Sequence, residues 1–261
     1  MEQNLKIART MLPRLAFGRA DNFNTRNDLI LSTDGDVRVH YAPFDYIETK
    51  ARLVVVGITP GKTQAINAIE AAVHALKRGL PIEAALAEAK LVGSFSGALR
   101  CNLVAMLDAI GVSNHFELPS TDELFRPGST DVHFTSALRY PVFVGGSNYN
   151  GTPDMLKTPC LRRIVDVHLS EEAAMLPNAI WLPLGPKAEA AVLHLVKSGK
   201  LSRKQVLGGM PHPSGANAER VSVFLGRKSP DRASNKTNPT TLLAAFDRLR
   251  GQIASLKGGE A

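Results

Sequence analysis

The sequence predicts an α/β fold, a three-layer sandwich in which helices cover a largely parallel, four-stranded central sheet. Short apolar runs alternate with stretches whose apolar residues recur at helical spacing. Such alternation is typical of a parallel sheet covered by helices. The chain of 261 residues is 44% hydrophobic, which is enough to bury the core of such a domain. The predicted strands are Leu53–Val56, Val132–Leu138, Ala179–Leu184 and Gln205–Met210.

Elements outside these strands follow from turn and helix signals. Residues 1–20 have the pattern of an amphipathic helix interrupted by Pro13, and Asp34-Gly35-Asp36 predicts a hairpin between residues 29–31 and 37–39. Gly79-Leu80-Pro81 breaks the first long helical stretch. The predicted helices cover residues 63–91 with that break, 97–110, 159–169, 187–197 and 240–255, and residues 145–151 and 226–239 form polar loops.

We divide the chain into a core and two extensions. Residues 1–49 are expected to be an N-terminal extension that packs on the core, and residues 50–225 are expected to form the main domain. Residues 226–261, a basic loop and a helix, are expected to complete the same domain. The loop carries Arg227, Lys228, Arg232 and Lys236 and would either contact a partner or be a flexible, solvated segment.

Composition restricts the classes of function. The net charge of +7 suits a polyanionic partner, although charge alone is weak evidence. No apolar run approaches the roughly 18 residues of a membrane span, and the start of the chain lacks a signal-peptide core. Cys101 and Cys160 have no metal-ligand spacing. We therefore expect a cytoplasmic monomer without membrane contacts, metal or cofactor.

One candidate loop follows the first predicted strand. Gly57-Ile58-Thr59-Pro60-Gly61 precedes Lys62-Thr63 and the first long helix, which invites comparison with a nucleotide-binding P-loop. The spacing fails, since three residues rather than four separate the glycines. Pro60 also lacks a backbone N–H that could bind phosphate. Taken alone, the loop favours a structural strand-to-helix turn, capped by Thr59 or Thr63, over a functional site.

A second candidate loop follows the last predicted strand. His212-Pro213-Ser214-Gly215 is preceded by Pro211, which makes His212 the one histidine of seven that lies inside a Pro-x-Pro turn at a strand exit. Most isolated histidines are surface or core residues. Because the carboxyl ends of parallel strands meet at one edge of the sheet, both loops are expected there.

Together, the two loops resemble the active-site motifs of the uracil-DNA glycosylase superfamily. The resemblance covers roughly residues 50–225, and His212, Pro213, Ser214 and Asn217 match the second motif. It implies that His212 donates a hydrogen bond to the base oxygen on which charge grows as the N-glycosidic bond breaks. Thr59 occupies the water-positioning place of the first motif, where Asn, Asp or Ala is usual. Thr can bind a water molecule but cannot act as a carboxylate base.

The resemblance extends to base recognition. Gly93-Ser94-Phe95-Ser96-Gly97 is similar to a segment of the iron–sulfur, thermophile-type branch whose aromatic residue stacks on the extruded base. Phe95 is the corresponding candidate, although it could instead be a core residue. Ser136 stands where that family has an Asn that reads the pyrimidine, and Ile58 is placed beside the base. With two cysteines, the chain cannot complete the four-thiolate cluster of that branch.

The remaining expected contacts are with DNA. The resemblance and the local charge assign them to Gly57, Pro60, Gly61, Lys62, Ser214, Gly215, Asn217 and Arg220. The implied function is that of a monofunctional glycosylase acting on uracil or a modified or hypermodified pyrimidine in DNA, in base-excision repair or in defence against phage. Neither motif contains a Lys in a Schiff-base position, so lyase activity is not expected. The alternatives are a catalytically silent protein that binds DNA or lesions and a P-loop-like nucleotide hydrolase.

Overall fold

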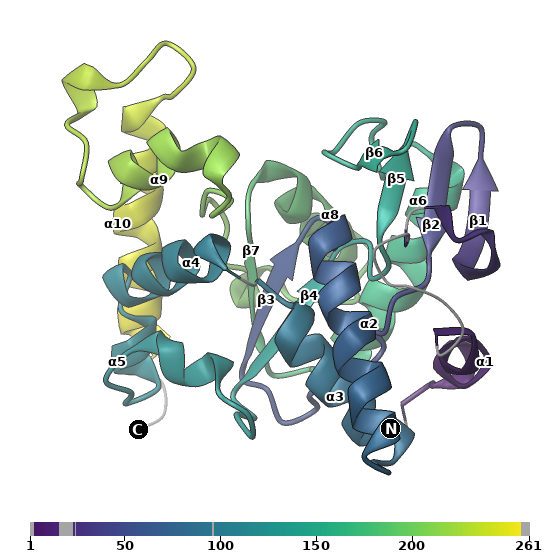
Figure 1. Cartoon of the computed structure of the whole chain (residues 1–261). Helices are drawn as coiled ribbons and strands as arrows, with labels where there is room; N and C mark the ends of the chain where they lie inside the picture. Colours follow the sequence, from purple (N-terminus) through teal and green to yellow (C-terminus); the bar gives the residue numbers. More distant parts are fainter. Residues whose placement is uncertain (1–2, 16–22, 24, 96, 257–261) are drawn as a thin grey trace.

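The computed structural model describes residues 3–15, 23, 25–95 and 97–256 and has a parallel three-stranded sheet at its centre (Figure 1). The strand order is β4 (Val132–Ser136), β3 (Leu53–Gly57) and β7 (Ile180–Pro183). Every residue of β3 is buried, as its unbroken apolar sequence predicts for a strand covered on both faces. The parallel pairing aligns the carboxyl ends of all three strands.

The prediction of a fourth strand at Gln205–Met210 is wrong. The segment runs parallel to β7 but forms only isolated bridges, at Val206 and Met210. Between them, the Gly209 N–H donates to the Glu189 carboxylate, and the Gly208 carbonyl accepts from Arg248. Glu189 thus takes the Gly209 N–H, and Pro183 of β7 has no N–H to donate, so the ladder is interrupted between the two bridges and the central sheet ends at β7.

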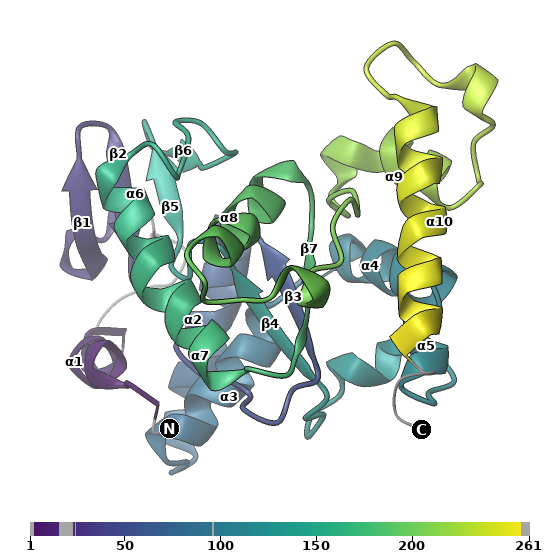
Figure 2. The ribbon, with the colours of Figure 1, turned by 180° about the vertical axis from the view of Figure 1, so that it is seen from behind.

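Helices cover both faces of this sheet. On one face, alternate residues such as Val55 and Leu182 pack in a hydrophobic cluster with α4, α5, α9 and α10. On the other face, Val54, Val56 and Trp181 pack with α2, α3, α6, α7 and α8. Figures 1 and 2 show these helix groups on opposite sides of the strands. The helices are α1 (Lys6–Leu15), α2 (Lys62–Lys77), α3 (Ile82–Gly93), α4 (Ala98–Ala109), α5 (Val112–His115), α6 (Pro159–Ile164), α7 (Ser170–Met175), α8 (Pro186–Lys197), α9 (Ala218–Phe224) and α10 (Pro239–Leu256).

A second, antiparallel sheet has the order β1-β2-β5-β6. Its strands are β1 (Ile30–Asp34), β2 (Val37–His40), β5 (Val142–Val144) and β6 (Ser147–Asn148). The predicted hairpin around Gly35 is therefore confirmed. The polar loop predicted at 145–151 contains a hairpin turn instead, in which Gly145 and Gly146 both have positive φ. Pairing of β2 with β5 joins this hairpin to the β1–β2 hairpin in one sheet.

The predicted helices are present with small changes in their ends. The break at residues 79–81 separates α2 from α3 as expected. Helix α6 continues through a π-helical stretch, Val165–Leu169, into α7, beyond the predicted end at 169. Pro13 lies inside α1, and residues 1–2 and 16–20 of the helix predicted there lie outside the described residues. Within the described ranges, none of the helices has the length and apolar character needed to cross a membrane.

Candidate active site

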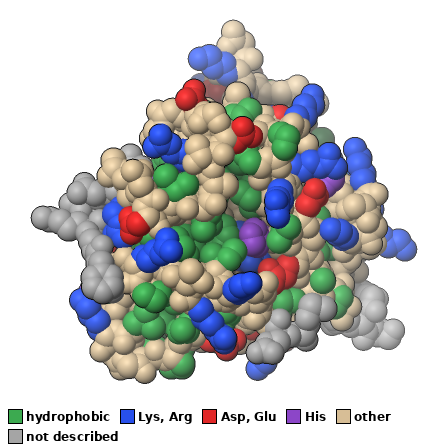
Figure 3. All heavy atoms as spheres, turned by 90° about the vertical axis from the view of Figure 1, so that its right-hand side faces the viewer, with side chains coloured by type: hydrophobic (Ala, Val, Ile, Leu, Met, Phe, Trp, Pro, Cys, Tyr) green, Lys and Arg blue, Asp and Glu red, His purple; other side chains and the backbone are tan. Residues whose placement is uncertain are grey.

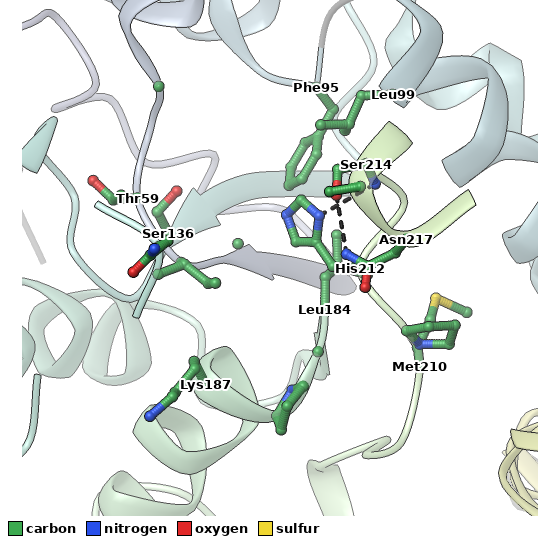
Figure 4. Close-up of a pocket in the computed structure, with 18 of the residues that line it drawn as sticks. Thr59, Phe95, Leu99, Ser136, Leu184, Lys187, Met210, His212, Ser214 and Asn217 are labelled. Atoms are coloured by element: carbon green, nitrogen blue, oxygen red, sulfur yellow. Dashed lines mark hydrogen bonds between the residues drawn. The ribbon is translucent and has the colours of Figure 1, made fainter. Parts of the chain in front are cut away.

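A cavity of about 1010 Å³ opens at the carboxyl ends of the central strands, and both predicted loops line it. In Figure 4, Thr59 and Ser136 lie on one side and His212 and Ser214 on the other. Two of the predicted site residues, Lys62 and Gly215, are not part of the lining. The predicted residues that do line it are Gly57, Ile58, Thr59, Pro60, Gly61, Phe95, Ser136, His212, Ser214, Asn217 and Arg220.

His212 presents one ring nitrogen to the cavity in a defined protonation state. Its Nδ1 accepts a hydrogen bond from the Ser214 N–H at 3.2 Å, so the neutral ring carries its proton on Nε2. Burial lowers the pKa of His212, which favours this neutral form. Gly185 (φ 82°) makes room for the residue, since a Cβ there would lie 3.4 Å from the His212 Cβ. The site therefore holds a neutral imidazole that can donate from Nε2.

Hydrogen bonds from side chains hold the rest of the His212 loop. The Ser214 Oγ accepts from Asn217 Nδ2 at 3.0 Å, and Asn217 Oδ1 accepts from Arg220 Nη1 at 2.7 Å. The Asn102 side chain donates to the Pro213 carbonyl at 2.9 Å. Ser214, Asn217 and Arg220 thus form a row of polar groups along the cavity rim, where an anionic ligand could be bound.

The Thr59 hydroxyl is already engaged within the protein. Its Oγ1 donates to the Tyr140 carbonyl at 3.0 Å and accepts from the Val142 N–H at 3.2 Å. A hydroxyl has one donor and two acceptor sites, so a single lone pair is left for a water molecule. Thr59 therefore joins its loop to the segment after β4, and its predicted role in placing water depends on that lone pair and on nearby backbone groups.

A buried ionic network anchors the segment to which Thr59 is bonded. The Tyr140 hydroxyl donates to Asp45 at 2.6 Å, and the next residue toward the N-terminus, Arg139, donates to Glu172 at 3.0 Å and to Glu171 at 3.0 Å. The cations Arg139 and then Lys90 hold the pKa of Glu172 well below its usual range, even though burial acts in the opposite direction. Burial lowers the pKa of Lys90 to about 8. This wall of the cavity is rigidly tied to the core.

Phe95 combines core packing with exposure to the cavity. Its ring packs edge-on against Phe134 with centroids 5.6 Å apart, and the residue is buried. Its φ of 46° is strained for a residue with a Cβ, a condition that clusters at functional sites. Both interpretations made from the sequence, core residue and base platform, are compatible with this position.

Sequence reasoning missed several polar groups of the cavity, among them Asn148. Asn148, on β6, lines the cavity, and its Oδ1 accepts from the Lys62 N–H at 3.0 Å. Its NH₂ group can still donate, which is relevant because Ser136 cannot supply both functions of an amide. The only local signal was a polar, glycine-rich loop. Its approach to the cavity depends on the long-range pairing of β2 with β5.

Two amides at the start of α2 are already bonded within the protein and cannot bind phosphate. The Gly61 N–H donates to Gln64 Oε1 at 2.9 Å, and the Lys62 N–H is bonded to Asn148. A P-loop needs such N–H groups directed at phosphate oxygens. The geometry therefore argues against the nucleotide hydrolase. In the described part of the chain, no three metal-ligating side chains come together, and Cys101 and Cys160 are free thiols.

Comparison with known proteins yields one informative relative. No family model matches the chain, and no solved structure matches it. The chain is 34% identical over 212 residues to a Bacillus subtilis (strain 168) protein described as uncharacterized protein YoxB. The match covers 78% of this chain and 83% of that protein, so it includes most of the fold described above.

Proposed function

The chain belongs to the same family as YoxB of Bacillus subtilis, and we propose that it is a monofunctional DNA glycosylase with a uracil-DNA glycosylase-like, three-layer fold. Its substrate would be DNA in which uracil or a modified pyrimidine is extruded into the cavity. The observation that carries the proposal is the convergence of the neutral His212 ring and the Gly57–Gly61 turn on one cavity.

His212 supplies the main chemical contribution. When the N-glycosidic bond breaks, negative charge develops on a carbonyl oxygen of the departing pyrimidine. A preorganised donor at that oxygen stabilises the transition state by about 3–4 kcal/mol in comparable sites. The Nε2–H of His212 is such a donor, and the Ser214 N–H keeps the ring in the required tautomer. Water then attacks the sugar carbon, placed by Thr59 and adjacent backbone groups.

The size and lining of the cavity bear on the substrate. At about 1010 Å³ it lies at the upper end of the range of roughly 300–1,000 Å³ typical of small-molecule sites. This volume includes the rim at Ser214, Asn217 and Arg220, so it is larger than the space for the base alone. Ser136 and Asn148 offer hydrogen bonds at one end, and Phe95 offers an aromatic ring. Uracil and modified pyrimidines are therefore both candidate substrates.

The polar residues at the cavity rim support the proposed binding of DNA. The duplex base must leave the stack before reaction, at a cost of a few kcal/mol that backbone contacts must offset. Ser214, Asn217 and Arg220 lie where the phosphates beside an extruded nucleotide would pass. Figure 3 shows Lys and Arg side chains spread over one face of the molecule, so net positive charge adds attraction that is not specific to sequence.

An oligonucleotide panel tests the proposal. Single- and double-stranded DNA carrying uracil or 5-substituted pyrimidines of increasing size would be incubated with the protein. Abasic sites would be cleaved by alkali, and the released base identified by mass spectrometry. We expect release of at least one base, and a loss of about 10²–10³-fold in rate for His212→Ala. His194→Ala is the matched control, because His194 is bonded to Asp166 and is not part of the cavity lining. Absence of any released base would overturn the proposal.

A second candidate is favoured by the bonding of Thr59. Since its hydroxyl proton is held by Tyr140, the site has a weak water-positioning group, as expected for a protein that binds lesions without turnover. That protein would bind DNA with abasic sites or modified bases tightly, and no base would be released in the same panel.

A further inference from the structure

Residues 226–238, here called the arm, connect α9 to α10 and extend away from the body of the protein in both ribbon views (Figures 1 and 2). Their sequence contains four basic residues and one acidic residue. Arg227, Arg232 and Lys236 are exposed, and their side chains form no ion pair with any other described residue. The arm therefore presents unneutralised positive charge to solvent.

One carboxylate at the base of the arm fixes its conformation. Glu219 Oε1 accepts from Lys228 Nζ at 2.6 Å and from the Ser234 N–H at 3.1 Å. Its Oε2 accepts from the hydroxyls of Ser234, at 2.5 Å, and Thr237, at 2.6 Å. These bonds, the one from Lys228 foremost, hold the pKa of Glu219 below its usual range. A loop of this composition would otherwise be mobile, and Glu219 organises it from both ends.

The arm is continuous with the cavity. Arg220 Nη2 donates to the Lys236 carbonyl at 3.1 Å, and the same guanidinium bonds Asn217 at the cavity rim. Lys236 and Asn238 line the cavity itself. A ligand backbone that passes the rim at Ser214 would therefore meet the arm next.

We propose that the arm is a preorganised site for the phosphate backbone of double-stranded DNA, reaching phosphates outside the nucleotide held in the cavity. This rests on the proposed function, because DNA is the ligand assumed to enter the cavity. A duplex is favoured over a single strand because its phosphates form a rigid array. An arm fixed in advance by Glu219 matches such an array without the entropy cost of ordering a flexible loop.

Binding of unmodified duplex DNA tests the arm separately from any base release. We expect the triple variant Arg227→Ala, Arg232→Ala, Lys236→Ala to lower the slope of log affinity against log salt by about 0.9 for each phosphate that the variant can no longer neutralise. The control removes three exposed lysines at the opposite edge of the sheet, Lys50, Lys77 and Lys197, and is expected to change that slope much less.

Glu219→Gln separates preorganisation from net charge. The substitution makes the protein more positive but weakens the bonds by which residue 219 holds the arm. We therefore expect the affinity for duplex DNA to fall about threefold to tenfold. Glu70→Gln, which removes a negative charge from an exposed position of α2, should raise affinity slightly or leave it unchanged. Circular dichroism would verify that each variant is folded.

These binding measurements distinguish failure of the arm proposal from failure of the glycosylase proposal. An unchanged salt slope in the triple variant, or tighter binding by Glu219→Gln, would overturn the arm proposal. Equal weakening of single-strand and duplex binding would overturn the assignment to duplex DNA. Failure of the glycosylase proposal is seen elsewhere, as the absence of base release by the wild-type protein, and leaves these binding measurements interpretable.

Discussion

The two sides of the cavity are built differently. On the Thr59 side, the loop is bonded to the segment after β4, and that segment is held by buried ions from α3 and α7. On the His212 side, the loop is held mostly by hydrogen bonds among residues a few positions apart, together with one bond from the Asn102 side chain to the Pro213 carbonyl. The first side is thus coupled to global stability, and the second is mainly concerned with ligand contacts. Substitutions on the two sides should separate accordingly.

The largest effect is expected in the buried network. Glu172→Gln removes the charge that compensates Arg139 and Lys90, and breaking a buried pair typically costs about 3–5 kcal/mol. The free energy of unfolding, measured with denaturant, should fall by about that amount. Glu171→Gln is the matched control, since Glu171 contacts the same Arg139 from a more exposed position and should cost much less. Equal losses for the two variants would contradict the distinction.

Thr59→Val should also act first on stability. Valine keeps the shape of threonine but leaves the Tyr140 carbonyl and the Val142 N–H without their partner, at a cost of about 1–3 kcal/mol. Thr59→Ser, which retains the hydroxyl, should unfold nearly as the wild type does. Unchanged stability combined with reduced base release in Thr59→Val would show that the hydroxyl acts mainly on water.

On the acidic side, the pH dependence of base release should reflect His212. Because burial lowers the pKa of His212 from its usual value of 6.5, the neutral ring predominates at neutral pH. Protonation of Nδ1 would break the bond from the Ser214 N–H that orients the ring, so the rate should fall once the pH is below the lowered pKa. His212→Asn, whose amide does not titrate, should be slower and lack this inflection. An inflection that persists in His212→Asn would assign the titration to another group.

The smallest effect is expected at the rim. Asn217→Ala interrupts the bonds to Ser214 and Arg220, and base release should fall by about three- to tenfold, which corresponds to roughly 1 kcal/mol. The free energy of unfolding should stay within about 0.5 kcal/mol of the wild type. A large loss of stability in this variant would show that the two sides are not as distinct as their bonding indicates.

Much of the fold could be predicted from local sequence signals. The apolar runs of β3, β4 and β7, the break before α3 and the turn at Gly35 are each encoded by a few adjacent residues. The meeting of the two loops at one cavity follows from the parallel arrangement of β3 and β7, although the roles assigned to their residues stay predictions. These features need no knowledge of distant partners.

What could not be predicted depends on residues far apart in the chain. The interruption of the fourth strand involves Glu189, which bonds the Gly209 N–H, and Pro183 of β7, which has no N–H to donate. The bonding of Thr59 to Tyr140 spans 81 positions. Such pairings leave no periodic pattern, so a side chain expected to face a ligand can instead be engaged by the protein.

The interrupted edge beside β7 also determines which part of the chain steers His212. The segment that precedes His212 is bonded to Glu189 of α8 and to Arg248 of α10. The position of the imidazole therefore depends on the last helix as well as on the sheet. A variant that lacks only the Arg248 side chain would therefore retain its three parallel strands and still hold its principal hydrogen-bond donor less firmly.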